Sequence, residues 1–408
     1  MDAAAGADTF CLMNKNEEVL SFADAGGNTF SPGRFEVLGA FDAKRLPRSF
    51  SDMESWLEKR LSARDRTHMN RLLWQCGCNS TSDFIRRTCA LSLNDTFWVK
   101  PADSSLSWSD VSLYRNDFAG PVADAALFGR DVRATEPLIL SPEFTTDGSY
   151  AKCWMRRRGR IYLLKSADRG SFKPLGFESY SEAMASQLAA AFLDERVEYR
   201  IVFSPEHRDD PRRSFSACEA FTSESVGFLQ YGRLHACDYD ASRPKSMLDF
   251  YASIGAEAAF RKMLVFDALC LNTDRHLGNH GVLFDADTLE VLGMAPVFDN
   301  NKAFLPSYDG EDFERMMACA ALLSSRIGDD FNGVAHFVLT DSLRRDLKNL
   351  RGFEFDRSLL PGLPESRIRL MERLIECQIE AILKGDPVGS VRGCGTDDGL
   401  DSFASLRL

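Results

Sequence analysis

The chain has 408 residues, of which 44% are hydrophobic, and a formal net charge of −11 at pH 7. It is long enough for two or three packed units with a sizeable core, and its acidic balance argues against a nucleic-acid-binding surface. No apolar run approaches the ~18 residues of a membrane span, and residues 1–8 lack the basic start and apolar core of a secretory signal.

The eleven cysteines are scattered, and Cys76 and Cys78 form the only close pair. No second pair stands at the spacing of a structural zinc site, and an odd number does not suit a disulfide framework. The cysteines are therefore expected to be reduced, mostly buried thiols in a cytoplasmic protein.

Residues 1–108 are predicted to form a mostly helical N-terminal region, to which the sequence assigns no role. Three segments have the apolar spacing of amphipathic helices: residues 51–64, 65–75 and 80–90. Residues 109–140, which are rich in Asp and Ala, are predicted to be a connector. The last stretch, 391–408, is rich in Gly, Asp and Ser and is expected to be a flexible tail.

Residues 141–225 have the pattern of a small β-rich unit. Apolar runs over 160–165 and 197–203 predict strands, and 213–221 is a third extended segment. Residues 180–193 lie between the first two of these and have a strongly helical pattern.

Residues 226–390 are predicted to form a larger, helical unit. Four segments have helical patterns: residues 254–271, 311–322, 338–350 and 364–384. Gly278 is expected to break the first of these helices, and a hairpin follows with strands at 282–284 and 289–292.

The most informative part of the chain is the segment 272–279, Asn-Thr-Asp-Arg-His-Leu-Gly-Asn, with Phe298-Asp299 after the hairpin. The hairpin would bring Asp299 back beside Asn279. Phosphoryl transfer from ATP needs such a set, because Asp274 can accept the proton of an attacking hydroxyl while Asn279 and Asp299 offer oxygen to Mg²⁺. A lone Asp and Asn at a helix end are usually caps or turn formers, but the whole combination favours the functional interpretation.

His276 and His280 stand four residues apart, which also suggests a zinc site with Asp274 or Asp299. Gly278 between them disfavours the helix that such a pair needs, and no Glu stands where a general base would be required. His276 is therefore expected to orient the catalytic loop, and His280 to be structural.

This stretch resembles the catalytic segment of HipA-like serine/threonine kinases, in the pattern Asn272-x-Asp274-x-His276-x2-Asn279 followed by Phe298-Asp299. Its central Asp-Arg-His-x2-Asn is also similar to phosphatidylinositol 3/4-kinases. The resemblance implies an α+β, two-lobed protein-kinase-like fold. The small β-rich lobe would span 141–225 and the larger helical lobe, with the catalytic loop, 226–390.

The resemblance also implies roles for residues upstream of this segment. Lys165, at the end of its predicted strand, is expected to contact the ATP phosphates, and Glu182 is expected to pair with it, with Glu178 as a rival. Glu219 and Phe221 lie where the resemblance places the hinge, whose backbone groups hydrogen-bond adenine. A plain strand end is equally consistent with these two residues.

Residues 145–152 precede the Lys165 strand and include Gly148, Ser149 and Lys152. They are either the loop that covers the ATP phosphates, where backbone amides and small side chains approach closely, or a plain β-turn. HipA-like kinases can phosphorylate a serine in their own phosphate loop, and Ser149 is the nearest candidate here.

Together these residues predict an ATP- and Mg²⁺-dependent kinase, resembling HipA-like serine/threonine kinases, that transfers the terminal phosphoryl group of ATP to a hydroxyl of an unidentified protein. Two alternatives stay open: a lipid or small-molecule kinase of the phosphatidylinositol-kinase type, and a nucleotide-binding pseudokinase that acts as a regulatory module. The resemblance alone implies a toxin–antitoxin role with a small helix-turn-helix partner.

Overall fold

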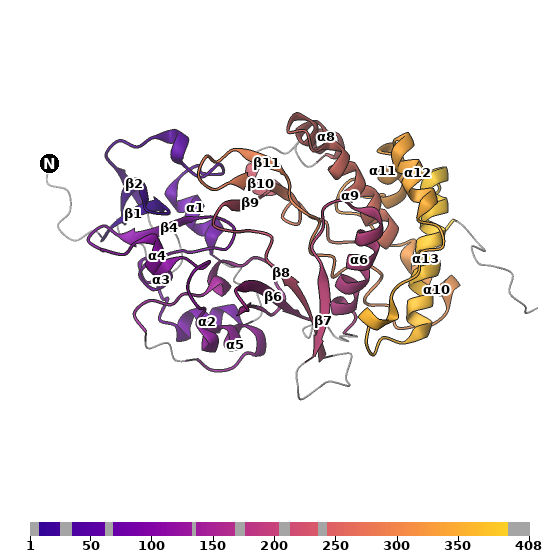
Figure 1. The fold of residues 1–408 in the computed structure, drawn as a ribbon, viewed down its shortest axis with the longest axis horizontal. Coiled ribbons are helices and arrows are strands. Elements are labelled where there is room, and N and C mark those ends of the chain that lie inside the picture. Colours follow the sequence, from indigo (N-terminus) through magenta and orange to yellow (C-terminus); the bar gives the residue numbers. More distant parts are fainter. Residues whose placement is uncertain are drawn as a thin grey trace, which may run out of the picture.

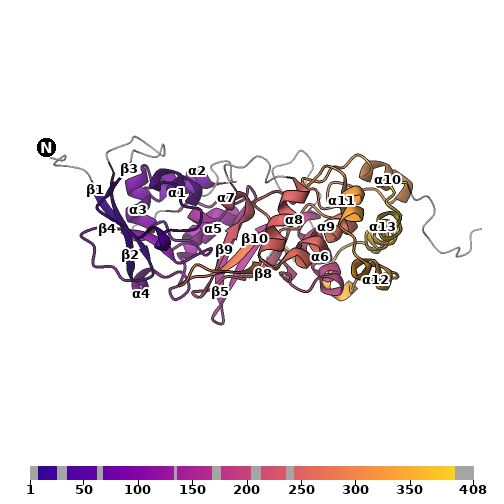
Figure 2. The ribbon, with the colours of Figure 1, turned by 90° about the horizontal axis from the view of Figure 1, so that it is seen from above.

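The computed structural model describes residues 8–24, 35–61, 68–132, 136–167, 176–203, 213–235 and 243–390. Figures 1 and 2 show an elongated arrangement, with the N-terminal region at one end, the last helices at the other and the small lobe between them. The predicted tail, 391–408, lies outside the described residues.

The N-terminal region is built on an antiparallel sheet, which corrects the prediction of a mostly helical region. Its strand order is β3-β2-β1-β4, with β1 (Asp8–Asn14), β2 (Glu17–Asp24), β3 (Phe35–Leu38) and β4 (Phe97–Pro101). The predicted helices are present as α1 (Met53–Arg60), α2 (Met69–Gln75) and α3 (Thr81–Thr88). The sheet escaped prediction because β1 is buried along most of its length and therefore does not alternate between apolar and polar residues.

The stretch 109–140, predicted as a connector, contains a helix that packs on the small lobe. A short helix, α4 (Trp108–Val111), comes first, and α5 (Gly120–Phe128) then contacts β5 (Lys152–Arg157). Leu127 of α5 is buried in one cluster with residues of the small lobe. Because α5 also contacts α2, the N-terminal region and the small lobe are joined by side-chain packing as well as by the chain.

The small lobe is a second antiparallel sheet, as its strand patterns predicted. Its order is β5-β6-β8-β7, with β6 (Arg160–Ser166), β7 (Tyr199–Phe203) and β8 (Ser214–Glu219). The register of β5 and β6 sets Lys152 directly opposite Lys165. The predicted helix is α6 (Glu178–Phe192), whose alanine-rich sequence favours a helix and which packs against β7 and β8.

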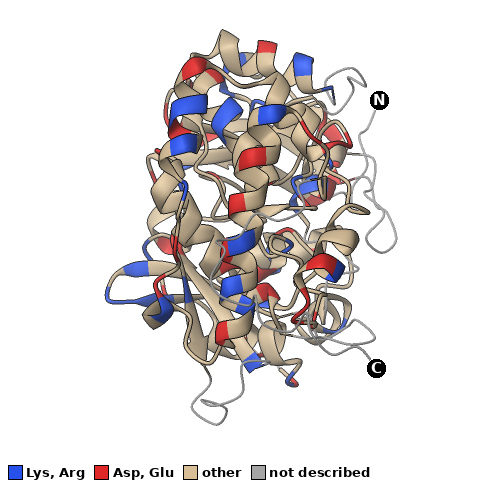
Figure 3. Cartoon of the chain, turned by 90° about the vertical axis from the view of Figure 1, so that its right-hand side faces the viewer, with Lys and Arg blue, Asp and Glu red and all other residues tan. Residues whose placement is uncertain are grey.

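The large lobe is mainly helical and begins with a sheet of order β11-β10-β9, formed by β9 (Val226–Gln230), β10 (Gly281–Asp285) and β11 (Val291–Met294). Its helices are α7 (Tyr231–Leu234), α8 (Pro244–Ser253), α9 (Glu257–Cys270), α10 (Phe313–Ala320), α11 (Phe331–Phe337), α12 (Asp341–Asn349) and α13 (Glu365–Lys384). Charges of both signs are interspersed over the face seen in Figure 3. Of the helices described, none is long and apolar enough to cross a membrane.

The described cysteines agree with the prediction of buried thiols. Of the nine cysteines that the structure describes, all but Cys319 are buried. Burial raises the pKa of the Cys218 thiol to about 12, so this group stays protonated at neutral pH.

His280, at the end of the segment before β10, is buried in the large lobe, in keeping with a structural role. Its Nδ1 lies 2.8 Å from the Tyr251 hydroxyl, and its ring stacks on Tyr231. Burial lowers the pKa of His280 from 6.5 to about 3. In the unfolded chain His280 therefore binds a proton near pH 6.5, whereas in the folded protein it stays neutral at that pH.

We expect this difference to make stability fall with acidification. The contribution of His280 is complete above pH 6.5 and is lost as the pH drops towards 3, by up to about 1.4 kcal/mol per pH unit. Urea unfolding of wild type and His280→Gln at several pH values between these limits measures it. The variant should have a shallower slope, and equal slopes would contradict a neutral, buried imidazole.

Candidate active site

A pocket lies between the small lobe, the large lobe and the N-terminal region. It is lined by most of the predicted site residues, namely Gly148, Ser149, Lys152, Lys165, Phe221, Asp274, His276, Asn279 and Asp299. Glu182 is fully buried and bonded to Lys165. The Glu219 side chain is the exception, because it turns away to pair with Arg160 at 3.0 Å.

Lys165 joins two carboxylates inside this pocket. Its Nζ lies 2.6 Å from Glu182 Oε1 and 2.5 Å from Asp299 Oδ1. The pairing predicted for Glu182 is therefore confirmed, and the rival Glu178 does not take that place. Burial raises the pKa of Asp299, but the charges of Lys165 and Lys152 outweigh this effect and hold the pKa at about 2. Asp299 is thus ionised at neutral pH.

The segment 272–279 begins where α9 ends. Leu271 adopts a left-handed conformation with φ of 50° and ends the helix, so the predicted break at Gly278 was placed too late. Asn279 Nδ2 donates to the carbonyl of Asp274 at 2.8 Å, which leaves the amide oxygen as the group that Asn279 can present to a cation. The Asp274 side chain lines the pocket and is 32% exposed.

Arg275 holds this segment in place, a role that the sequence did not reveal. Its buried guanidinium pairs with Asp267 of α9, Nε to Oδ2 at 2.9 Å and Nη2 to Oδ1 at 3.0 Å. It also donates to the carbonyls of Asn279 and Phe298, at 2.9 and 2.5 Å, and to Asn300 Oδ1. One feature of the sequence could have indicated this role. Asp267 stands inside the apolar run of α9, and a buried carboxylate needs a positively charged partner.

Asp274 has an environment suited to a proton acceptor. Burial raises the pKa of Asp274 above its usual value, while nearby His276, Arg326 and Lys302 oppose that shift. A carboxylate with a raised pKa binds a proton more readily at neutral pH. His276 accepts a hydrogen bond on Nδ1 from the Gly278 N–H at 3.0 Å, which fixes its ring at the pocket wall.

The loop before β5 is tied to the large lobe. Asp147 Oδ2 accepts from Gln230 Nε2 at 2.9 Å and from Arg233 Nη2 at 2.8 Å, and these donors belong to β9 and α7. Lys152 Nζ reaches back to the Asp147 carbonyl at 2.5 Å. Gly148 has φ of +92°, and a Cβ there would meet Lys152 Nζ at 2.5 Å. The φ of Gly148 is what favours glycine here, since Lys152 Nζ is the end of a flexible side chain that could move.

Three phenylalanines form an apolar wall of the pocket. The ring centroids of Phe221 and Phe228 are 5.3 Å apart, and each lies 5.4 Å from the centroid of Phe298. Phe221 follows β8, in the predicted hinge. An apolar, aromatic surface of this kind suits a flat ring system.

The N-terminal region also lines the pocket, which the sequence did not predict. Ser92, Leu93 and Asn94, between α3 and β4, lie on its wall. The Asn94 carbonyl accepts from the Phe228 N–H at 2.7 Å, which joins this wall to β9. No local pattern distinguishes these residues, so only the docking of the whole region could reveal them.

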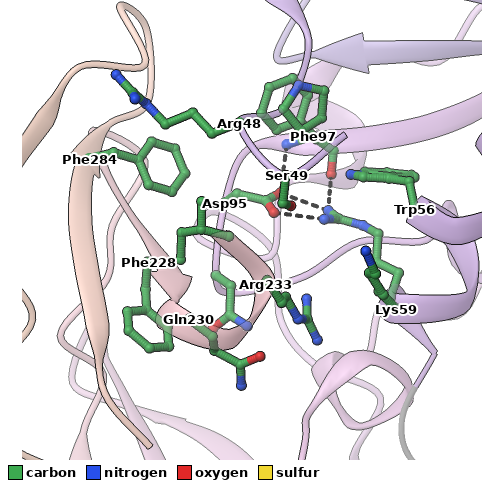
Figure 4. A pocket seen from close by; sticks show the side chains of 14 residues that line it. Arg48, Ser49, Trp56, Lys59, Asp95, Phe97, Phe228, Gln230, Arg233 and Phe284 are labelled. Atoms are coloured by element: carbon green, nitrogen blue, oxygen red, sulfur yellow. Dashed lines mark hydrogen bonds and ion pairs between the residues drawn. The ribbon is translucent and has the colours of Figure 1, made fainter. Parts of the chain in front are cut away.

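A smaller cavity adjoins the pocket where the N-terminal region meets β9 and β10 (Figure 4). Arg60 makes two bonds to Asp95 there, each 2.7 Å long. Gln230 and Arg233 line this cavity as well as holding Asp147. The hydrogen bonds from Gln230 and Arg233 to Asp147 therefore lie between the two cavities.

The donor atoms of Asn279 and Asp299 fit a hard cation. In the part of the chain that the structure describes, no three His, Cys, Asp or Glu side chains gather as a metal site by themselves. Mg²⁺ usually takes one or two protein oxygens and completes its shell with phosphate and water oxygens. One ionised carboxylate and one amide oxygen on the same pocket meet that need.

Comparisons with known proteins reach this chain through structure alone. No protein-family model matches the sequence, and no curated protein sequence matches it. The chain is similar to HipA of the Shewanella oneidensis MR-1 toxin–antitoxin system, solved with HipB and operator DNA. The TM-score is 0.53 at 12% identity, over 94% of this chain and 100% of that chain.

Two further solved structures match part of the chain. The Helicobacter pylori proinflammatory kinase CtkA has a TM-score of 0.44 at 15% identity, over 58% of this chain and 91% of its own. The Golgi casein kinase has a TM-score of 0.26 at 13% identity, over 58% and 71%. Of these three matches, the one to HipA extends over nearly the whole chain, its N-terminal region included. The chain therefore has the two-lobed, protein-kinase-like fold of HipA, as its sequence predicted.

Proposed function

We propose that the chain is an ATP- and Mg²⁺-dependent kinase, resembling HipA-like serine/threonine kinases, that transfers the terminal phosphoryl group of ATP to a protein hydroxyl. The observation that carries the proposal is the Lys165 bridge between Glu182 and Asp299, on the same pocket as Asp274 and Asn279. Phosphoryl transfer needs a cation for the phosphates, oxygen ligands for the metal and a group that receives the hydroxyl proton.

Each of these residues has one task in the proposed reaction. Lys165, oriented by Glu182, neutralises charge on the phosphates, and Asn279 and Asp299 hold Mg²⁺ against them. Bound Mg²⁺ supplies further charge neutralisation. Asp274 orients the attacking hydroxyl and accepts its proton, for which its raised pKa is suited. Positioning and electrostatics provide most of the catalysis in this type of transfer.

The rest of the pocket supports a bound nucleotide. The phenylalanine wall offers apolar surface to adenine, and we include in the proposal hydrogen bonds from the backbone around Glu219 and Phe221 to the adenine edge. Lys152, opposite Lys165 on the neighbouring strand, adds a second positive charge for the phosphates. Ser149 lines the same pocket, and we include its autophosphorylation in the proposal.

A partner protein is a further part of the proposal. HipA was solved together with HipB and operator DNA. We propose by analogy a small helix-turn-helix partner for this chain. Copurification of the chain with the product of an adjacent small open reading frame would test it.

The proposed activity is tested with ATP labelled on its terminal phosphate. Wild type with Mg²⁺ is expected to label itself or an added protein. Asp299→Asn is expected to reduce labelling by about 100-fold or more, because it removes the charge that holds the metal. The matched control is Asp287→Asn, an exposed carboxylate of the hairpin that precedes Asp299, which should keep full activity.

Nucleotide binding decides between the remaining interpretations. Wild type that binds ATP but transfers and consumes none would support a regulatory binding module instead. Wild type that binds no ATP would refute the proposal. Mapping the label, and comparing Ser149→Ala with wild type, shows separately whether Ser149 is the site of self-labelling.

A further inference from the structure

Arg326 is a strongly exposed arginine placed beside Asp274. Its Nε is 3.9 Å from Asp274 Oδ1, and 65% of its side chain is exposed. This separation is longer than a hydrogen bond, and in the described residues Arg326 makes no other ion pair. Arg326 does not line the nucleotide pocket. Its guanidinium donors therefore face the space next to Asp274 from outside that pocket.

The turn that carries Arg326 is anchored to the large lobe. The next residue, Ile327, is 1% exposed and belongs to the main core. The Ser325 N–H donates to the Asp329 carbonyl at 3.0 Å, and the Ile327 N–H donates to Ser325 Oγ at 3.1 Å. A fixed backbone presents the arginine at a constant place, which reduces the entropy lost when it binds a ligand.

A second positive charge lies near Asp274, although the chain as a whole is acidic. Lys302 Nζ lies 5.1 Å from the centroid of the Tyr150 ring, and its charge, like that of Arg326, acts on Asp274. The Arg326 turn also carries two exposed carboxylates, Asp329 and Asp330, and Glu178 Oε1 lies 4.0 Å from Lys302 Nζ. Of the arginine and lysine cations that act on Asp274, Arg326 is the more exposed, with 65% of its side chain accessible against 29% for Lys302.

We propose that Arg326 binds an acidic group next to the acceptor hydroxyl, so that the acceptor is a serine or threonine with Asp, Glu or a phosphorylated residue beside it. This inference rests on the proposed function and names the substrate class of that site. A carboxylate or phosphate can accept two parallel bonds from a guanidinium, which fixes the position of the group that carries it. A basic neighbour would be repelled by Arg326 and Lys302.

The inference is tested with serine peptides that place Asp, Ala or Lys at each position around the serine, using ATP labelled on its terminal phosphate. Wild type is expected to prefer the best Asp peptide over its Ala counterpart by about tenfold in kcat/KM, the effect of one charged pair. Arg326→Gln is expected to lose this preference, and Arg326→Glu to prefer Lys. Arg369→Glu, an exposed arginine of α13, is the matched control and should behave as wild type.

The outcomes separate this inference from the proposed function. Self-labelling by wild type without any preference for acidic peptides overturns the inference and leaves the kinase proposal standing. An equal rise for all peptides in Arg326→Gln also overturns it, because Arg326 would then only restrain Asp274. Absence of transfer by wild type, to itself and to every peptide, overturns both.

Discussion

Substitution of Arg275 by methionine is expected to lower the free energy of unfolding by about 3–5 kcal/mol, the usual loss when one partner of a buried ion pair is removed. Arg275 is 1% exposed, and the change leaves the buried Asp267 carboxylate without its cation. It also removes the bonds to the carbonyls of Asn279 and Phe298. Urea unfolding with an unchanged m value measures the loss.

The control for this variant removes both charges at once. In Arg275→Met with Asp267→Leu no buried ion is unpaired, so the double variant is expected to be more stable than the single one. The exposed pair of Arg369 with Glu365 gives a second reference, since surface pairs contribute about 0–1 kcal/mol. A loss as small as that in Arg275→Met would contradict the buried network.

Substitution of Lys165 by methionine is expected to reduce phosphoryl transfer by about 100- to 1000-fold, the range for loss of one preorganised electrostatic contact. The buried methionine fills similar space but offers no charge to the phosphates. It also leaves Glu182 and Asp299 without the cation that lies between them. Lys262→Met is the matched control. Lys262 belongs to α9, pairs with the exposed Asp194 and does not line the pocket.

The same variant has a readout that does not need the enzyme to turn over. Burial by itself raises the pKa of Asp299, and Lys165 is the largest charge that brings it down to about 2. Without Lys165 that pKa is expected to rise, so the carboxyl takes up its proton at higher pH. Carboxyl NMR titration of wild type and variant measures the change. An unchanged pKa would place Lys165 away from Asp299 in solution.

The residues that line this pocket were predictable where they follow one another in a local order. The order and spacing of Asp274, Asn279 and Asp299 can be recognised without knowledge of the rest of the fold. To predict that Lys165 pairs with Glu182, it was enough to recognise a strand followed by a helix. Both the two-lobed fold and that pairing are confirmed.

Contacts made by docking were not predictable in the same way. Asp147 meets Arg233 of the large lobe only because the lobes fold against one another. Asn94 reaches the pocket only because the N-terminal region docks on β9. The sheet of that region was missed for a related reason, since burial on both faces removes the alternation that marks a strand.

The residues that line the pocket are spread over a long stretch of the sequence, which has a consequence for biosynthesis. Its walls extend from Ser92 to Asn301, so no shorter nascent chain can form the complete site. A ligand stabilises only a state that it can bind. Nearly three quarters of the chain must therefore emerge from the ribosome and persist without help from a ligand bound in this pocket. Before Asn301 emerges, α5 can already pack against α2 and β5, as it does in the complete fold.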